Sequence, residues 1–258
     1  MKEISLISKY VLYDLLRSKF IIALAILLFS MSAVFFYMDA NVSKTLLSLL
    51  NIVLLLIPLV TTVFTTIHFY NSREFMEMLL SQPISRRSLF FAQWISVSLS
   101  LCIAFLAGVG SAIIIWAPQP IFIWLIICGI FLILVFTSVS FLISAMLADK
   151  THGMGATLLT WFFFSVIYDG LVLMLLFAFS DYPLEKPVLI LTALNPIDLA
   201  RLLLLLKLDN AAIMGYTGTI FQDFLGTNKG IIICILILVV WLIVPLQIAW
   251  RKFYRKDF

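Results

Sequence analysis

The chain has 258 residues, of which 64% are apolar and only 12% are charged, whereas a soluble domain carries about 25% charged residues. A water-soluble core of this size could not hide so much apolar surface, so the composition excludes a soluble globular protein and predicts a chain surrounded by lipid. The net charge of +4 is small and gives no reason to expect a nucleic-acid partner.

The first predicted element is an amphipathic helix over residues 1–19. Apolar residues recur there at steps of three and four, and four Lys or Arg residues accompany them. Such a helix can lie in the headgroup plane of a membrane with its cations toward anionic lipid. The alternative is a plain flanking segment without special geometry, and we expect the interfacial helix.

Six apolar segments follow, and each reaches the length of about 20 helical residues that crosses a membrane. They cover residues 20–38, 45–70, 89–116, 121–147, 156–179 and 231–250. The sequence therefore predicts an all-α integral membrane protein, with six transmembrane helices in a single domain. An even number of spans puts both termini on the same side of the membrane.

The distribution of basic residues predicts the orientation of these spans. With the N-terminus inside, twelve of the 17 Lys and Arg residues fall on inner segments, and cytoplasmic loops are the ones enriched in Lys and Arg. We therefore expect a multi-pass protein of the inner (cytoplasmic) membrane with both termini in the cytoplasm.

The longest polar interruption in the first two thirds of the chain lies between the second and third spans. It predicts a short cytoplasmic helix over residues 72–82. Asn71 or Ser72 can cap this helix, and with Asn71 as the cap, Glu74 stands three residues later, where its side chain can reach the cap amide. Pro83 ends it, because proline disfavours helical geometry in the preceding residue.

This short helix is predicted to bind a soluble partner. An apolar face at helical spacing, made by Phe75, Met78, Leu79 and Gln82, can fill a groove on that partner. Charged neighbours can fix the register of docking, and they are Glu74, Glu77, Arg86 and Arg87. The alternative is a loop helix that is merely solvated.

The fifth span contains a carboxylate, Asp169, which follows Tyr168. A carboxylate at membrane depth is costly and usually faces the bundle interior or a water-filled cavity. Two interpretations stay open for Asp169. It can be a pathway or conformational-switch residue, or it can bond a neighbouring helix and serve packing only.

The segment 181–229 is outside in this topology and too long for a tight turn. Asn195 can cap a helix there, Pro196 suits its first position, and Asp198 fits its first turn. The apolar run that follows is too short to span. We expect one or two helices that lie at, or dip into, the outer membrane face, rather than a seventh span that would put the basic C-terminal tail outside.

Small residues recur at four-residue steps in the third span, at Ala104, Gly108 and Ala112. This spacing lets helices approach closely. It is compatible with packing inside the bundle or against a second copy of the chain.

Catalytic and cofactor motifs are missing from the sequence. No GxxxxGK[ST] pattern occurs, so the chain has no P-loop for ATP, and neither His68 nor His152 belongs to a metal-ligand pattern. We predict that the chain is not an enzyme, has no catalytic residue or metal site, and binds no cofactor. Any ATP and Mg²⁺ would belong to a partner ATPase.

The stretch REFMEMLLSQPISRRSLFFAQW, residues 73–94, resembles the loop between the second and third spans of ABC-2-type permeases. The pattern there is an acidic residue, a Leu pair, then a Pro and Ser/Thr-Arg before the next span. The matching residues are Glu74, Glu77, Leu79, Leu80, Pro83 and Arg86. Two more stretches, YDGLVLML (168–175) and LNPIDLARLLLL (194–205), are similar to the NosY-type permeases of nitrous-oxide reductase maturation systems, and the second resemblance rests on Asn195, Pro196, Asp198 and Arg201.

The resemblance implies a homodimeric membrane subunit that is powered in trans. Two copies of a cytoplasmic ATPase (NosF-type) would dock on the helix at 72–82, which makes it a coupling helix, through Arg73, Glu74, Phe75, Glu77, Met78, Leu79, Leu80, Pro83 and Arg86. A periplasmic β-helical protein (NosD-type) would sit on the outer segment 181–229, in contact with Asn195, Pro196, Asp198 and Arg201.

The same resemblance implies a role in supplying copper or sulfur to the copper centres of nitrous oxide reductase. Two alternatives remain. One is an ABC-2 exporter of a lipid, drug or other small molecule, and the other is a membrane scaffold that assembles partners without passing cargo.

Overall fold

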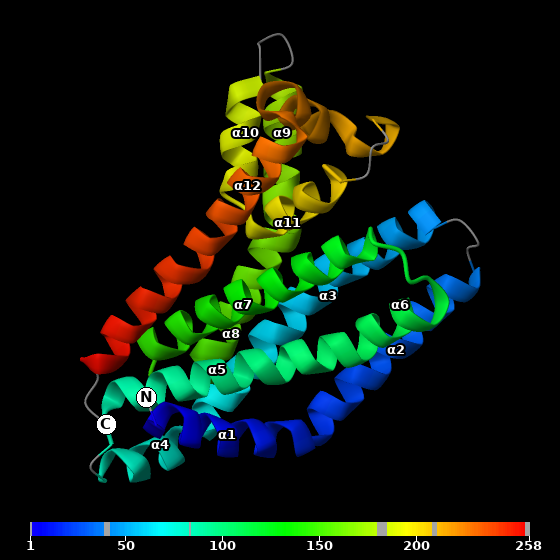
Figure 1. The fold of residues 1–258 in the computed structure, drawn as a ribbon. Coiled ribbons are helices and arrows are strands. Elements are labelled where there is room, and N and C mark those ends of the chain that lie inside the picture. The colour runs from blue at the N-terminus through cyan, green and yellow to red at the C-terminus, as the bar shows by residue number, and fades with distance from the viewer. Residues whose placement is uncertain (1, 39–41, 83, 180–184, 208–210, 256–258) are drawn as a thin grey trace.

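The computed structural model describes the backbone of residues 2–38, 42–82, 84–179, 185–207 and 211–255. Within these ranges every regular element is a helix (Figure 1). Among the described residues, six helical segments are long and apolar enough to cross a membrane. They are α2 (Lys19–Met38), α3 (Val42–Asn71), Arg86–Trp116, α7 (Phe122–Met146), Lys150–Ala178, and Lys229–Tyr254 within α12 (Ala211–Tyr254). The prediction of an all-α protein with six spans is confirmed.

Two of the six spans contain a π-helical turn. The third span is built from α5 (Arg86–Phe105), η1 (Leu106–Gly110) and α6 (Ser111–Trp116). The fifth consists of α8 (Lys150–Phe162), η2 (Phe163–Ile167) and α9 (Tyr168–Ala178). Such turns widen the helix and are frequent at functional sites.

Helix α7 forms the centre of the bundle, where it contacts α3, α5, α11 (Pro196–Leu205) and α12. At one end of the bundle, aromatic rings from four helices pack together. The ring of Phe90 lies 5.3 Å from that of Phe253 and 5.6 Å from that of Phe141, while Phe69 contacts the last two. These fully or nearly fully buried rings hold the ends of α3, α5, α7 and α12 together by apolar burial and edge-to-face contact.

The small residues of the third span pack inside the subunit. Ala104, Gly108 and Ala112 are buried, and a Cβ added at Gly108 would lie 2.6 Å from the Cβ of Leu28 on α2. Of the two possibilities for this stripe, the structure therefore shows packing within the bundle, and only glycine at position 108 permits this approach of α2.

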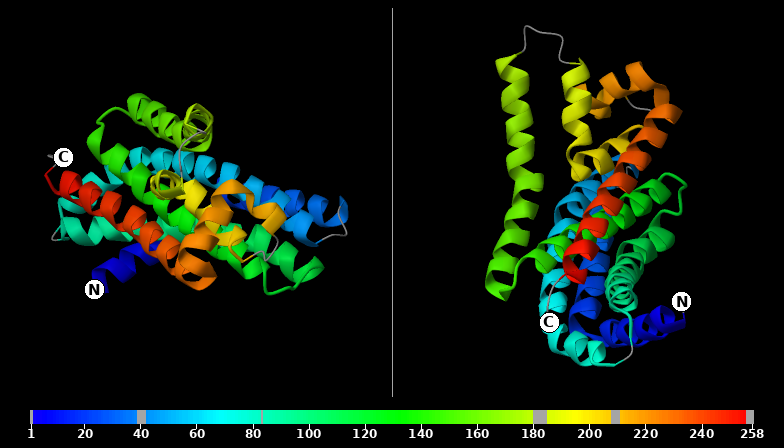
Figure 2. Two further views of the ribbon diagram at one scale, coloured as in Figure 1. Left: turned by 90° about the horizontal axis from the view of Figure 1, so that it is seen from above. Right: turned by 90° about the vertical axis from the view of Figure 1, so that its left-hand side faces the viewer.

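Helix α1 (Lys2–Arg17) is amphipathic and runs across the direction of α2 (Figure 2). Its residues Ile7, Val11 and Leu15 are buried where α1 packs on α5. Leu6 and Tyr13, on the opposite side, are exposed. The helix predicted at the N-terminus is thus present, and its position in the headgroup plane stays a prediction.

Both termini lie at one end of the bundle, beside α4 (Arg73–Leu80), as an even number of spans requires (Figure 1). The opposite end holds α9, α10 (Glu185–Ala193), α11 and the start of α12 (Figure 1). The outer segment expected at 181–229 contains α10, α11 and the first part of α12, which makes three helical stretches instead of the one or two predicted. Residues 180–184 and 208–210 lie outside the described part of the chain.

Candidate functional site

The short helix α4 is held on the bundle by one buried side chain and by the polar contacts of Arg73. Met76 is 1% exposed and belongs to the core. Arg73 forms an ion pair with Glu77 at 3.5 Å and donates a hydrogen bond to the Ala148 carbonyl, in the turn before α8, at 3.0 Å. Helix α4 is therefore attached to the apolar core of the bundle through Met76 and to the loop between the fourth and fifth spans through Arg73.

The outer face of α4 combines charged and apolar side chains. Glu74, Phe75, Glu77 and Met78 are exposed, and Phe75 and Met78 keep 41% and 55% of their surface accessible. Exposed large apolar side chains with polar neighbours mark surfaces that can dock a partner. We refer to Glu74, Phe75, Glu77 and Met78 as the α4 face.

Of the other residues predicted for docking, Gln82 and Arg87 are exposed, whereas Leu79, Leu80 and Arg86 are less accessible. Leu79 and Leu80 are half-buried against the core. Arg86 donates a hydrogen bond to the Tyr254 carbonyl at 2.9 Å, which links the start of α5 to the end of α12. Pro83 lies outside the described residues.

The capping box predicted at the start of α4 is wrong. Helix α3 continues to Asn71, whose side-chain oxygen accepts a hydrogen bond from the Lys150 Nζ at 2.9 Å. Ser72 occupies the cap position, but its hydroxyl donates to the His68 carbonyl at 2.7 Å and caps nothing. Both side chains predicted to cap α4 thus bind elsewhere. Asn71 binds a residue far away in the sequence, and Ser72 binds the preceding turn of α3.

A second group of polar residues lies where α10 and α11 meet the fifth span. Asn195 caps α11, with Pro196 at its first position, as the sequence predicted. The Asn195 side chain accepts from the Ile197 amide and donates to the Phe164 carbonyl of η2 and to Asp198, each at 3.0 Å. The turn between α10 and α11 is thereby tied to the π-helical turn of the fifth span.

Arg201 joins the two carboxylates of this group. Its Nη1 lies 3.5 Å from an oxygen of Asp169 and 3.7 Å from one of Asp198. The neighbouring Tyr168 donates its hydroxyl to the Leu191 carbonyl of α10 at 2.6 Å. The carboxylate of the fifth span is thus bonded to a neighbouring helix, and the cluster Asp169–Asn195–Asp198–Arg201 connects α9 with the α10–α11 hairpin.

The electrostatics of this cluster favour a proton on Asp198. Burial and the nearby Asp169 carboxylate raise the pKa of Asp198, Arg201 opposes the rise, and the net result is a pKa of about 7. Two carboxylates share one guanidinium here, so a proton on Asp198 relieves the excess negative charge. Chemically, the cluster can act as a proton-sensitive link between span and hairpin.

The four residues predicted to contact a periplasmic protein differ in their exposure. Asn195 and Pro196 are buried, whereas the side chains of Asp198 and Arg201 retain 17% and 41% of their surface. Contact of this segment with another protein stays a prediction, and the observed bonds are within the subunit.

Sequence reasoning missed the partner of Asp169. The signal was present, because a lone carboxylate in a span predicts a nearby cation or donor, but Arg201 stands 32 residues further along the chain. It also missed a polar cavity that involves Asp14, His68 and Gln93 at the other end of the bundle. Within the described residues, no three His, Cys, Asp or Glu side chains converge as metal ligands.

Comparison with known proteins identifies relatives over most of the chain. The family model for ABC-2 family transporter proteins matches residues 52–258. A protein of Pseudomonas aeruginosa named probable ABC transporter permease protein NosY is 29% identical, over 81% of this chain and 84% of the relative. A protein of the same name from Stutzerimonas stutzeri is 24% identical over 99% of both chains. With its six candidate spans, the chain belongs to the ABC-2 family of transporter proteins.

Proposed function

We propose that this membrane subunit couples ATP hydrolysis by a separate cytoplasmic ATPase (NosF-type) to movement at its outer face. The observation that carries the proposal is the α4 face, an exposed set of acidic and apolar side chains on a helix that Met76 and Arg73 fasten to the bundle. A helix fastened in this way transmits a push from a docked partner to α3, α5 and the loop before α8. The absence of a P-loop from the sequence supports an external source of energy.

The membrane arrangement follows from the same proposal. The chain lies in the inner membrane with both termini and the α4 face in the cytoplasm, and it works as a homodimer with two ATPases. The excess of basic residues on the segments at this end supports the orientation.

At the outer end, the α10–α11 hairpin meets a periplasmic β-helical protein (NosD-type). Asn195, Pro196, Asp198 and Arg201 fix the position of the hairpin, since their described bonds run to the fifth span and within α11. Exposed side chains of α10 such as Ile190, 64% accessible, supply contact surface. By similarity to the NosY-named relatives, the assembly serves copper or sulfur supply to nitrous oxide reductase.

Docking on α4 is tested by reversing the character of its face. The double variant Glu74→Arg, Met78→Asp places a cation and a new carboxylate on the α4 face and leaves the Arg73–Glu77 ion pair intact. Co-purification of a NosF-type ATPase with the chain should therefore fall at least tenfold. Both side chains are exposed, so the variant should still insert and elute as wild type in size-exclusion chromatography.

The matched control is Arg251→Glu, a charge reversal at an exposed site in the last turn of α12. It should leave ATPase binding unchanged. Wild-type co-purification of the double variant, with equal insertion, would exclude the α4 face as the docking surface.

A further inference from the structure

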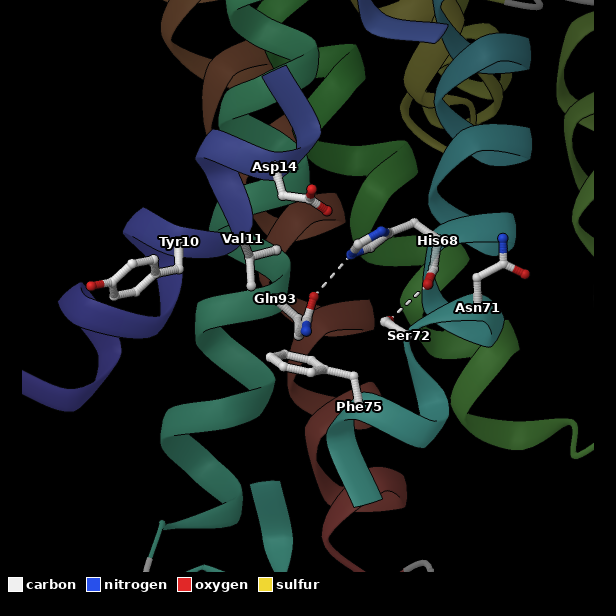
Figure 3. Close-up of a pocket in the computed structure, with 8 residues that line it drawn as sticks. All are labelled: Tyr10, Val11, Asp14, His68, Asn71, Ser72, Phe75 and Gln93. Carbon is white, nitrogen blue, oxygen red and sulfur yellow. Dashed lines mark hydrogen bonds between the residues drawn. The ribbon is translucent and has the colours of Figure 1, made fainter. Parts of the chain in front are cut away.

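A cavity of about 430 Å³ opens at the end of the bundle that carries the termini, between α1, the α3–α4 junction and α5 (Figure 3). Asp14 and His68 extend toward its centre from opposite sides, Gln93 and Phe75 lie below them, and Tyr10 points outward at the rim (Figure 3). Asn71 and Ser72 complete the polar lining. None of these side chains except Phe75 belongs to the docking surface proposed above.

Gln93 presents a buried side-chain amide whose nitrogen makes no hydrogen bond. The residue is 2% exposed, and its side-chain oxygen lies 2.9 Å from the His68 Nε2. The amide nitrogen has no partner. Exchanging the amide oxygen and nitrogen would leave the other atom unpaired instead, so one polar atom faces the cavity in either assignment. Leaving such an atom unpaired costs about 1–3 kcal/mol, which points to a polar ligand.

The charge of the cavity indicates the chemical class of that ligand. Asp14 supplies a carboxylate, and in the described part of the chain no Lys or Arg lines the cavity or pairs with Asp14. The neighbouring Arg17 is engaged with the Tyr13 hydroxyl and ring. A carboxylate without a cationic partner favours an ammonium group through charge. The Phe75 ring lies across the cavity from Asp14, on the far side of Gln93 (Figure 3).

The surroundings of the cavity indicate where the ammonium comes from. Tyr10 and Lys9 also line a second hollow of about 440 Å³, along the side of α1 that carries Leu6, Tyr13 and Leu16. Leu6 and Tyr13 are 62% and 56% exposed. A mostly apolar hollow with one cation, Lys9, next to a cavity that contains a carboxylate fits an amphiphile whose headgroup carries both an ammonium and a phosphate.

We propose that the cavity binds the primary ammonium of a phosphatidylethanolamine-type lipid, whose acyl chain lies along the exposed side of α1. A primary ammonium donates hydrogen bonds to the oxygens of Asp14 and Ser72, which a trimethylammonium cannot do. The Gln93 amide takes an oxygen of the headgroup. Because Ser72 and Phe75 begin α4, the bound lipid ties α1 to the first turn of that helix.

The test uses the full chain, without any ATPase, in nanodiscs of equal phosphatidylethanolamine, phosphatidylcholine and phosphatidylglycerol. After detergent extraction, native mass spectrometry measures which lipids stay bound. Wild type should retain phosphatidylethanolamine at least fivefold over the other two. Asp14→Asn should abolish this preference, because it removes the charge and keeps the shape.

The control variant is Asp149→Asn, an exposed carboxylate at the same end of the bundle that caps α8 and that Asn replaces as a cap. It should retain the wild-type preference. Equal retention of phosphatidylethanolamine and phosphatidylcholine by wild type, or an unchanged preference in Asp14→Asn, would overturn the proposal.

Two further measurements show whether the bound ammonium belongs to a lipid or to a soluble amine. They also keep the proposal testable if a variant fails to insert. Glycerophosphoethanolamine has the headgroup without acyl chains; if it displaces the lipid at equal concentration, the ligand is a soluble amine and the lipid assignment is wrong. Phosphatidylethanolamine with a photoreactive acyl chain should label the α1 peptide of wild type, and the phosphatidylcholine analogue should not. Equal labelling by both analogues contradicts the proposal without need of any variant.

Discussion

Asn195 connects three parts of the fold through one fully buried side chain. Its oxygen caps α11, and its nitrogen bonds both the carbonyl of Phe164 in the π-helical turn and the carboxylate of Asp198. A π-helical turn displaces backbone carbonyls from regular pairing, so a side-chain amide satisfies one of them here. Asn195 thus positions the hairpin together with the Arg201–Asp169 ion pair and the Tyr168–Leu191 hydrogen bond. Its cap role was readable from the sequence, and its other two bonds were not.

At the residue scale, Asp198 makes the hairpin sensitive to pH. Its folded pKa of about 7 lies above the ordinary value of 3.8, so the folded state binds the proton more tightly than the unfolded state. The resulting stabilisation is complete below about pH 4 and is lost as the pH rises through 7. When the pH falls from 8 to 5.5, the free energy of unfolding should increase by about 2 kcal/mol from this group.

We therefore expect the thermal stability of wild type, relative to Asp198→Asn, to increase when the pH falls from 8 to 5.5. The amide cannot titrate, so the variant lacks this contribution, and the difference between the two Tm-against-pH curves isolates Asp198. Parallel curves would show that Asp198 does not hold a proton in this range.

At the scale of elements, Gly108 and Gly110 of the π-helical turn η1 differ in how closely other residues approach them. A Cβ at Gly108 would meet the Leu28 Cβ at 2.6 Å and the Ala25 carbonyl at 3.0 Å, atoms that move only with α2 itself. A Cβ at Gly110 would find its nearest neighbour at 3.7 Å, which is ordinary contact. The packing of α2 on the third span therefore depends on Gly108.

Gly108→Ala should lower the thermal unfolding temperature in detergent, since displacing a packed helix costs about 1–3 kcal/mol. Gly110→Ala, in the same turn, should be neutral or slightly stabilising because alanine restricts the unfolded chain. Equal stability of the two variants would mean that α2 can shift away from position 108 without a loss of folding free energy.

The two short helices near the bundle ends differ in how well local rules described them. The Asn-Pro entry of α11 follows capping preferences, and the structure has it as predicted. The entry of α4 follows the same preferences, yet α3 continues to Asn71 and Lys150 binds its side chain. Local rules hold where no distant residue competes for the capping atom.

At the scale of the whole molecule, the topology predicts which positions a membrane-impermeant maleimide reaches. Cys128 and Cys234 are fully buried and Cys102 is half-buried in a span, so wild type should stay unlabelled. Gln119→Cys lies in the exposed turn before α7 and Arg251→Cys near the C-terminus. In intact spheroplasts Gln119→Cys should be labelled and Arg251→Cys should not, until the membrane is opened. The reverse pattern would invert the orientation.

The sequence by itself determined the class of the protein, the number of spans, the short helix between the second and third spans, and the family. These features depend on composition, hydrophobic length and short-range spacing, which are properties of contiguous residues. Only the tertiary structure decided the partners of polar side chains. Arg201 meets Asp169, and Asp14 meets the space beside His68 and Gln93, because packing of helices far apart in the chain brings them together. Most helix faces in this bundle are apolar, so hydropathy predicts that each helix is surrounded by lipid or protein but not its rotation or its neighbours. The rotation and the neighbours of each helix decide which polar groups come together.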